Sequence, residues 1–210
     1  MKPSTPESQH LEPQHTKTSQ EVPLQKAQST FWKDTFQLAL IIIFVVIPFR
    51  VFVAQPFIVS GTSMQPGFQD RDYLIVDQLS YRLGDPERGD VVIFRYPNNT
   101  KVFYIKRIIG LPGDTVIVKD EQVYIEPLGS TERITIEEPY IDSFRPEDSK
   151  TTLMSDQFYV MGDNRLVSSD SRVWGPLDRE FITGRAFLRL FPLNQIGIFP
   201  EDYKSYPDSL

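Results

Sequence analysis

One feature constrains this chain more than any other, an unbroken apolar run over residues 38–49 (LALIIIFVVIPF). With its flanks the apolar stretch covers residues 36–54, close to the roughly 20 residues that a helix needs to cross a bilayer. A cleaved secretory signal is one alternative, but its apolar region is typically about 7–15 residues long, and Phe52 stands where a small residue is expected. A buried core helix is the other, and the sequence offers it no helical partner. The run therefore predicts a transmembrane anchor over residues 32–56.

The residues before the run differ sharply from it. Residues 1–31 are rich in Pro, Ser, Thr, Gln, Glu and Lys, so they can bury too little apolar surface to offset their ordering entropy. We expect a disordered tail there. Lys26 and Lys33 precede the run and Arg50 follows it, and this charge balance favours a tail in the cytoplasm and a C-terminal domain outside it.

The residues after the run carry the pattern of β-strands. Eight short segments are rich in β-branched or aromatic residues and are separated by turn-forming clusters such as Pro112-Gly113-Asp114. They cover residues 73–78, 90–96, 101–109, 115–120, 122–127, 133–138, 157–162 and 182–190. The pattern predicts a mainly β domain over residues 57–210, built as a barrel or sandwich, with a surface excursion at 127–150.

The composition excludes several kinds of chemistry. The chain has no Cys, which excludes a thiolate nucleophile and Cys-based metal sites. Its two histidines, His10 and His15, both lie in the polar tail, so a Ser-His-Asp triad and a His-based zinc site are disfavoured. A net charge of −6 without a basic stripe argues against nucleic acid as a partner. We expect no metal and no cofactor.

Four short motifs carry the functional signal. They are SGTSMQP (60–66), RGDVVIF (88–94), YIKRIIGLPGD (104–114) and GDNRLVSSDSRVWGPL (162–177). In this order, behind a single apolar run, they resemble bacterial type I signal peptidases, membrane-bound serine endopeptidases that remove signal peptides from exported proteins. The resemblance implies a signal-peptidase-like β domain that acts as a monomer, with preproteins and membrane lipid as its partners. It implies a location in the plasma membrane with the catalytic domain outside the cytoplasm, and the thylakoid membrane is a second possibility.

The catalytic assignment joins this resemblance to a physical argument. A serine hydroxyl is a poor nucleophile unless a base takes its proton, and without a usable His the base must be another side chain. Lysine serves only when neutral, so its pKa must fall from about 10.4, which burial in an apolar site achieves. Strand alternation places Lys106 on the same face as Tyr104 and Ile108. Ser63 is therefore predicted to be the nucleophile and Lys106 the general base.

The resemblance also implies supporting residues. The backbone N–H of Ser63 would donate to the oxyanion, whereas Gly61 stands where many members carry a second donor hydroxyl, so that donor stays open. Ser168 matches a serine that orients the lysine amine. A charged cluster that buttresses the loops is matched by Asp163, Arg165, Asp170 and Arg172. Shallow pockets for small residues at the first and third positions before the cut are matched by Phe57, Val59, Met64, Tyr104 and Ile105.

Two departures from the family pattern keep other interpretations open. Leu166-Val167 replaces a polar pair beside Ser168, and Gly67-Phe68 replaces the more common Thr-Leu. One alternative is a catalytically inactive, membrane-tethered β domain. Another is a Ser–Lys self-cleaving regulatory protease, although the sequence shows no helix-turn-helix pattern. A glycosidase that uses Asp163 and Asp170 as a carboxylate pair is poorly supported.

Overall fold

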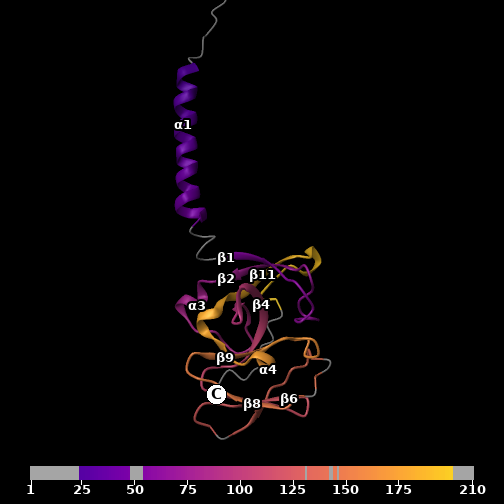
Figure 1. Ribbon diagram of the computed structural model, residues 1–210. Helices are drawn as coiled ribbons and strands as arrows, with labels where there is room; N and C mark the ends of the chain where they lie inside the picture. Colours follow the sequence, from indigo (N-terminus) through magenta and orange to yellow (C-terminus); the bar gives the residue numbers. More distant parts are fainter. Residues whose placement is uncertain (1–23, 48–53, 131, 142–143, 146, 201–210) are drawn as a thin grey trace, which may run out of the picture. The chain divides into compact units, whose positions relative to one another are not determined.

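The computed structural model describes residues 24–47, 54–130, 132–141, 144–145 and 147–200 (Figure 1). These residues fall into two compact units that divide between Phe44 and Val45, and each unit is described by itself. The expected disordered tail lies mostly outside the described residues, as do residues 48–53 of the expected anchor.

The first unit is helical. Helix α1 spans Leu24–Ile41 and continues as a π-helical turn, η1, over Ile42–Val46. Good helix formers such as Leu, Gln, Lys and Ala fill much of α1, which accounts for the helix. The described side chains from Phe31 to Ile47 are all exposed. Among the described helices, none combines the length and the apolar character that crossing a bilayer requires. The membrane anchor therefore stays a prediction.

The second unit is built on a large antiparallel sheet in the order β1-β2-β11-β3-β4-β9-β10, with β12 paired to β11. Its strands are β1 (Ala54–Ile58), β2 (Tyr73–Asp77), β3 (Val91–Tyr96), β4 (Asn99–Gly110), β9 (Gln157–Met161), β10 (Leu177–Asp178), β11 (Ile182–Phe191) and β12 (Gly197–Ile198). Among the described strands β1 and β10 stand at opposite ends of this order, so the sheet is open. The prediction of a mainly β domain is confirmed. The predicted barrel is wrong, because the described strands do not close into a barrel.

A smaller sheet lies at the opposite end of this unit from β1 and β2 (Figure 1). Its order is β7-β6-β5-β8, with β5 at Thr115–Lys119, β6 at Gln122–Glu126, β7 at Ile134–Thr135 and β8 at Ser149–Thr152. The β5–β6 turn has positive φ at Asp120 and Glu121, as the turns of tight hairpins require. Short helices complete the unit: α3 (Ser80–Leu83), α4 (Ser171–Trp174), η2 (Arg179–Phe181) and η3 (Leu193–Gln195).

The core explains why β3 and β4 are central. Along β3 the side chains alternate between two clusters, with Val91 and Ile93 in one and Val92 and Phe94 in the other. Both faces of β3 are thus packed, as the continuous apolar run predicts. In β4, Lys106 pairs with Val92 and Arg107 with Val91, so both charged side chains start from the buried centre of the sheet. A third cluster fills the interior beside the smaller sheet.

Candidate active site

The structure brings Ser63 and Lys106 together from separate elements. Ser63 lies in the loop between β1 and β2, and Lys106 lies in β4. The distance from Lys106 Nζ to Ser63 Oγ is 2.7 Å, and Nζ also donates to the carbonyl oxygen of Ile105 at 2.9 Å. A base at this distance from a hydroxyl can take its proton directly.

Burial changes the acid–base behaviour of Lys106. Its side chain is only 3% exposed, and its Nζ lies 5.3 Å from the centre of the Tyr104 ring. Burial lowers the pKa of Lys106 from 10.5 to about 8, against the opposing influence of the Asp170 and Asp163 carboxylates. The neutral amine is therefore accessible slightly above neutral pH, which an ordinary lysine does not allow.

The loop that carries Ser63 is held by hydrogen bonds on both sides. The carbonyl oxygen of Ser63 accepts from the backbone N–H of Asn164 at 3.0 Å. The N–H of Gly61 donates to Asp70 Oδ1 at 2.9 Å, and Gly61 has a φ of +103°, a conformation that favours glycine. Asp70 carries no motif signal, and only the folded loop reveals its contact. The Gly61 N–H is occupied, so it does not supply the second oxyanion donor in this arrangement.

Ser168 is buried close to the pair. Its N–H donates to the carbonyl oxygen of Asn164 at 3.1 Å, which closes the turn that follows Gly162. A Cβ at Gly162 would overlap both Ser168 Oγ and the carbonyl oxygen of Ser63, so the loop and the segment that carries Ser63 pack closely together. Among the described residues, Lys106 Nζ donates hydrogen bonds to Ser63 Oγ and to the carbonyl oxygen of Ile105. Ser168 does not accept a hydrogen bond from this amine.

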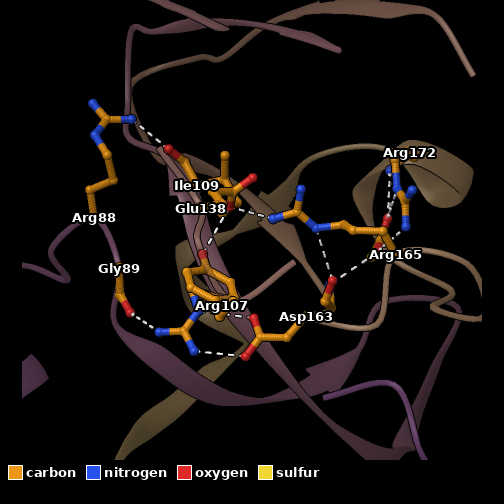
Figure 2. A network of polar contacts seen from close by, with 11 residues as sticks. Arg88, Gly89, Arg107, Ile109, Glu138, Asp163, Arg165 and Arg172 are labelled. Carbon is orange, nitrogen blue, oxygen red and sulfur yellow. Dashed lines mark hydrogen bonds and ion pairs between the residues drawn. The ribbon is translucent and has the colours of Figure 1, made fainter. Parts of the chain in front are cut away.

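The predicted charged cluster forms a buried network around this loop (Figure 2). Asp163 accepts two hydrogen bonds from Arg107, at 2.9 and 2.7 Å, and Asp170 accepts two from Arg172, both at 2.8 Å. Burial by itself raises the pKa of Asp170, but Arg172, the Gly162 N–H and Ser168 together hold that pKa below its ordinary value.

The fourth member of the cluster, Arg165, pairs with Glu138 (Figure 2). Glu138 and Arg107 were not assigned to the site from the sequence. Arg107 follows Lys106 directly in the sequence, but the sequence does not show that its side chain is buried. Glu138 lies in the segment predicted to be a surface excursion.

An apolar cavity of about 310 Å³ adjoins the pair. Four of the predicted pocket residues, Phe57, Val59, Tyr104 and Ile105, line it together with Ser63 and Lys106. Met64 does not line it, because its side chain is 1% exposed and packs into the core cluster below the loop. Residues that line the cavity without having been predicted include Leu74, Ile93 and Val167. The first two lie in predicted strands and had no predicted role in the site, and Val167 is one of the departures from the family pattern.

Within the described ranges, no group of three or more His, Cys, Asp or Glu side chains is arranged to hold a metal ion. The fold and the site together define a mainly β protein that presents a serine and a buried lysine beside an apolar cavity.

Comparison with known proteins agrees with this description. Residues 32–191 match the family described as "Signal peptidase, peptidase S26". A probable signal peptidase I-2 from Synechocystis sp. is 36% identical over 176 residues, which cover 81% of this chain and 78% of that protein. Signal peptidase I from Leptolyngbya laminosa is 39% identical over 161 residues, 70% of this chain and 74% of that protein. Signal peptidase I from Bacillus licheniformis is 34% identical over 184 residues, 81% and 94% respectively.

The chain belongs to the signal peptidase family, and within it resembles the bacterial type I enzymes. It is a serine endopeptidase.

Proposed function

We propose that this protein is a membrane-bound signal peptidase that uses Ser63 as nucleophile and Lys106 as general base. The observation that carries the proposal is the 2.7 Å separation of Lys106 Nζ and Ser63 Oγ at the edge of an apolar cavity. Family membership supports the substrate class, which is preproteins that bear a signal peptide.

The chemistry follows from the pair. Neutral Lys106 takes the proton of Ser63 Oγ while the oxygen attacks the scissile carbonyl carbon. The resulting oxyanion accepts a hydrogen bond from the backbone N–H of Ser63, and the Lys106 ammonium group then gives its proton to the leaving amine. In the second half, Lys106 takes a proton from water, which attacks the carbonyl carbon of the acyl ester. The bond to Ser63 Oγ then breaks, the Lys106 ammonium group returns its proton to that oxygen, and the product leaves as the carboxylic acid.

The cavity supports a preference for small side chains before the cut. Its walls are largely apolar and include Phe57, Val59, Tyr104 and Ile105, and its volume of about 310 Å³ lies at the small end of ligand sites. A peptide that binds with small residues at the first and third positions before the cut would fit such walls. We assign supporting roles to Ser168 at the base and to the buried ion pairs of Asp163, Arg165, Asp170 and Arg172 in holding the loops.

Membrane attachment is a further part of the proposal. The apolar stretch at residues 36–54 has the length and composition of a single membrane-spanning segment. With the tail in the cytoplasm, the catalytic domain would face the far side of the plasma membrane or, in a cell that has one, the thylakoid membrane. We expect the protein to act as a monomer.

The test is direct cleavage of a preprotein. Detergent-solubilised protein is incubated with a preprotein, beside the Ser63→Ala variant, and the new N-terminus is mapped by mass spectrometry. We expect one cut after a small residue with the parent protein and none with Ser63→Ala. Cleavage by Ser63→Ala at the parent rate would remove Ser63 from the mechanism, and a folded but inactive parent would favour an inactive tethered domain.

A further inference from the structure

The segment that follows the smaller sheet reaches into the active-site network. Ile136 and Phe144 belong to the core cluster beside this sheet, and the Ile136 N–H donates to the carbonyl oxygen of Val123 in β6 at 2.9 Å. Glu138 lies between these two residues in the sequence, so the segment that carries it is anchored to the core beside the smaller sheet.

Glu138 contacts one arginine of the buried network. Its Oε1 accepts a hydrogen bond from Arg165 Nη2 (Figure 2). The same oxygen accepts a hydrogen bond from the Tyr140 hydroxyl at 2.8 Å. The side chains of both members of the ion pair are nearly inaccessible, at 0% for Arg165 and 7% for Glu138. The guanidinium carbon of Arg165 also lies 5.0 Å from the centre of the Phe144 ring. Two residues of this segment therefore hold the same arginine.

Arg165 passes this restraint to the nucleophile through the backbone. Its Nε donates to the carbonyl oxygen of Gly162 at 3.1 Å, which ties the turn 162–165 together. Within this turn the Asn164 N–H donates to the carbonyl oxygen of Ser63 at 3.0 Å. These contacts link Glu138 to Ser63. Because Gly162 packs closely against Ser63 and Ser168, a shift of the turn would also move one of them.

Loss of the Glu138 charge would redirect Arg165. Asp163 also attracts Arg165 electrostatically, although it is already the partner of Arg107. A buried guanidinium without its carboxylate would compete with Arg107 for Asp163, because an unpaired buried charge is costly. Arg107 adjoins Lys106 in β4, so the disturbance would reach both members of the proposed pair.

We propose that Glu138 is a positioning residue for catalysis: through Arg165 it fixes the turn 162–165 against Ser63, and so couples the smaller sheet to the active site. This inference rests on the proposed function of Ser63 and Lys106. It gives the smaller sheet a role in the reaction rather than in stability alone.

The test measures kcat, KM and the pH profile of kcat/KM for Glu138→Gln, Glu138→Asp and a matched control in the full-length protein. The control is Glu126→Gln, which removes a glutamate of β6 in the smaller sheet that also pairs with an arginine, Arg133, at 2.9 Å, but on the exposed surface. Glu138→Gln should lower kcat by about 10- to 100-fold with KM within about threefold of the parent, because the reacting atoms are misplaced while the cavity stays. Glu138→Asp should recover part of kcat, and Glu126→Gln should match the parent.

The pH profile separates positioning from simple loss of folded protein. A looser turn admits water to Lys106, so the acid limb of kcat/KM should move to higher pH in Glu138→Gln. An unchanged kcat, or a lower kcat with an unmoved or downward-shifted limb, overturns the inference. Ser63→Ala is assayed in parallel: if it keeps activity, the proposed function itself fails. If it is inactive while Glu138→Gln behaves as the parent, only the inference about Glu138 fails.

Discussion

The guanidinium group of Arg107 donates to both carboxylate oxygens of Asp163, at 2.9 and 2.7 Å, and both side chains are essentially inaccessible to solvent. Arg107 is the residue after Lys106 in β4, and Asp163 begins the loop that leads to Ser168. The pair therefore ties the strand that carries the proposed base to the loop that packs on the proposed nucleophile. Its strength should be visible in both stability and activity.

Asp163→Asn should lower the free energy of unfolding by about 3–5 kcal/mol, because the change leaves the buried Arg107 charge without its carboxylate. Asp85→Asn is the control, since it also breaks an Asp–Arg pair, but Asp85 is 87% exposed and its pair with Arg179 is expected to contribute only about 0–1 kcal/mol. Chemical denaturation of the three proteins at one pH provides the comparison. An equal loss of unfolding free energy in the two variants would contradict the claim that burial makes the Arg107–Asp163 pair the stronger one.

The rate of preprotein cleavage should rise with pH. Lys106 acts as a base only when neutral, and burial places its pKa at about 8, so kcat/KM should fall below that pH and level off above it. The double variant His10→Gln/His15→Gln should give the same curve, which excludes histidine, whose ordinary pKa is about 6.5. A rate that stays flat from pH 6 to pH 10 would rule out Lys106 as the titrating base.

Lys106→Met should stabilise the fold while abolishing activity. With a pKa of about 8 in the folded chain against 10.5 as the ordinary value, protonated Lys106 opposes folding, fully below pH 8 and not at all above pH 10.5. At pH 7 the apolar replacement should therefore raise the free energy of unfolding by about 3 kcal/mol, since one pKa unit corresponds to about 1.4 kcal/mol. The gain should shrink between pH 8 and pH 10.5 in denaturation curves. A gain that does not vary with pH would show that packing alone is responsible.

Gly162→Ala should impair catalysis strongly. The added methyl group would overlap Ser168 Oγ and the carbonyl oxygen of Ser63, and the latter is backbone that moves only with the nucleophile loop. We expect a fall in kcat on the order of 10²-fold, in line with a displacement of about 1 Å at a reacting group. Gly84→Ala is the matched control, because its nearest neighbour for a Cβ is the Ser80 carbonyl oxygen at an ordinary 3.5 Å. Steady-state kinetics that fail to distinguish the two variants would remove the packing argument.

Much of the fold was readable from the sequence because strand patterns are local. All eight predicted strand segments contain a strand, and a turn at Asp120-Glu121 separates β5 from β6. Strand β1 is not among the predicted segments because Ala54 ends the apolar stretch 36–54, and the predicted anchor extends through residue 56. The open order of the large sheet was also out of reach, since it depends on pairing between strands distant in the chain, such as β2 with β11.

The site shows the same division between local and distant information. Ser63 and Lys106 are 43 positions apart in the sequence, and no local pattern relates them. Their predicted pairing rests on the family resemblance. The position of Met64 in the core rather than in the lining of the cavity was out of reach, because a sequence motif does not show which way a loop side chain turns. Glu138 was missed because a polar residue in an apparent surface segment gives no sign that it will meet a buried arginine.

In the proposed mechanism, the walls around the cavity contribute to reactivity as much as Ser63 and Lys106 do. A lysine amine is neutral near physiological pH only while water is kept from it, because hydration favours the protonated form, so the availability of the neutral amine depends on close packing. Mild heating that loosens the sheet around Val92 and Tyr104 should abolish cleavage before the secondary structure melts. Inactivation would then precede unfolding, and restoring tight packing would restore the nucleophile.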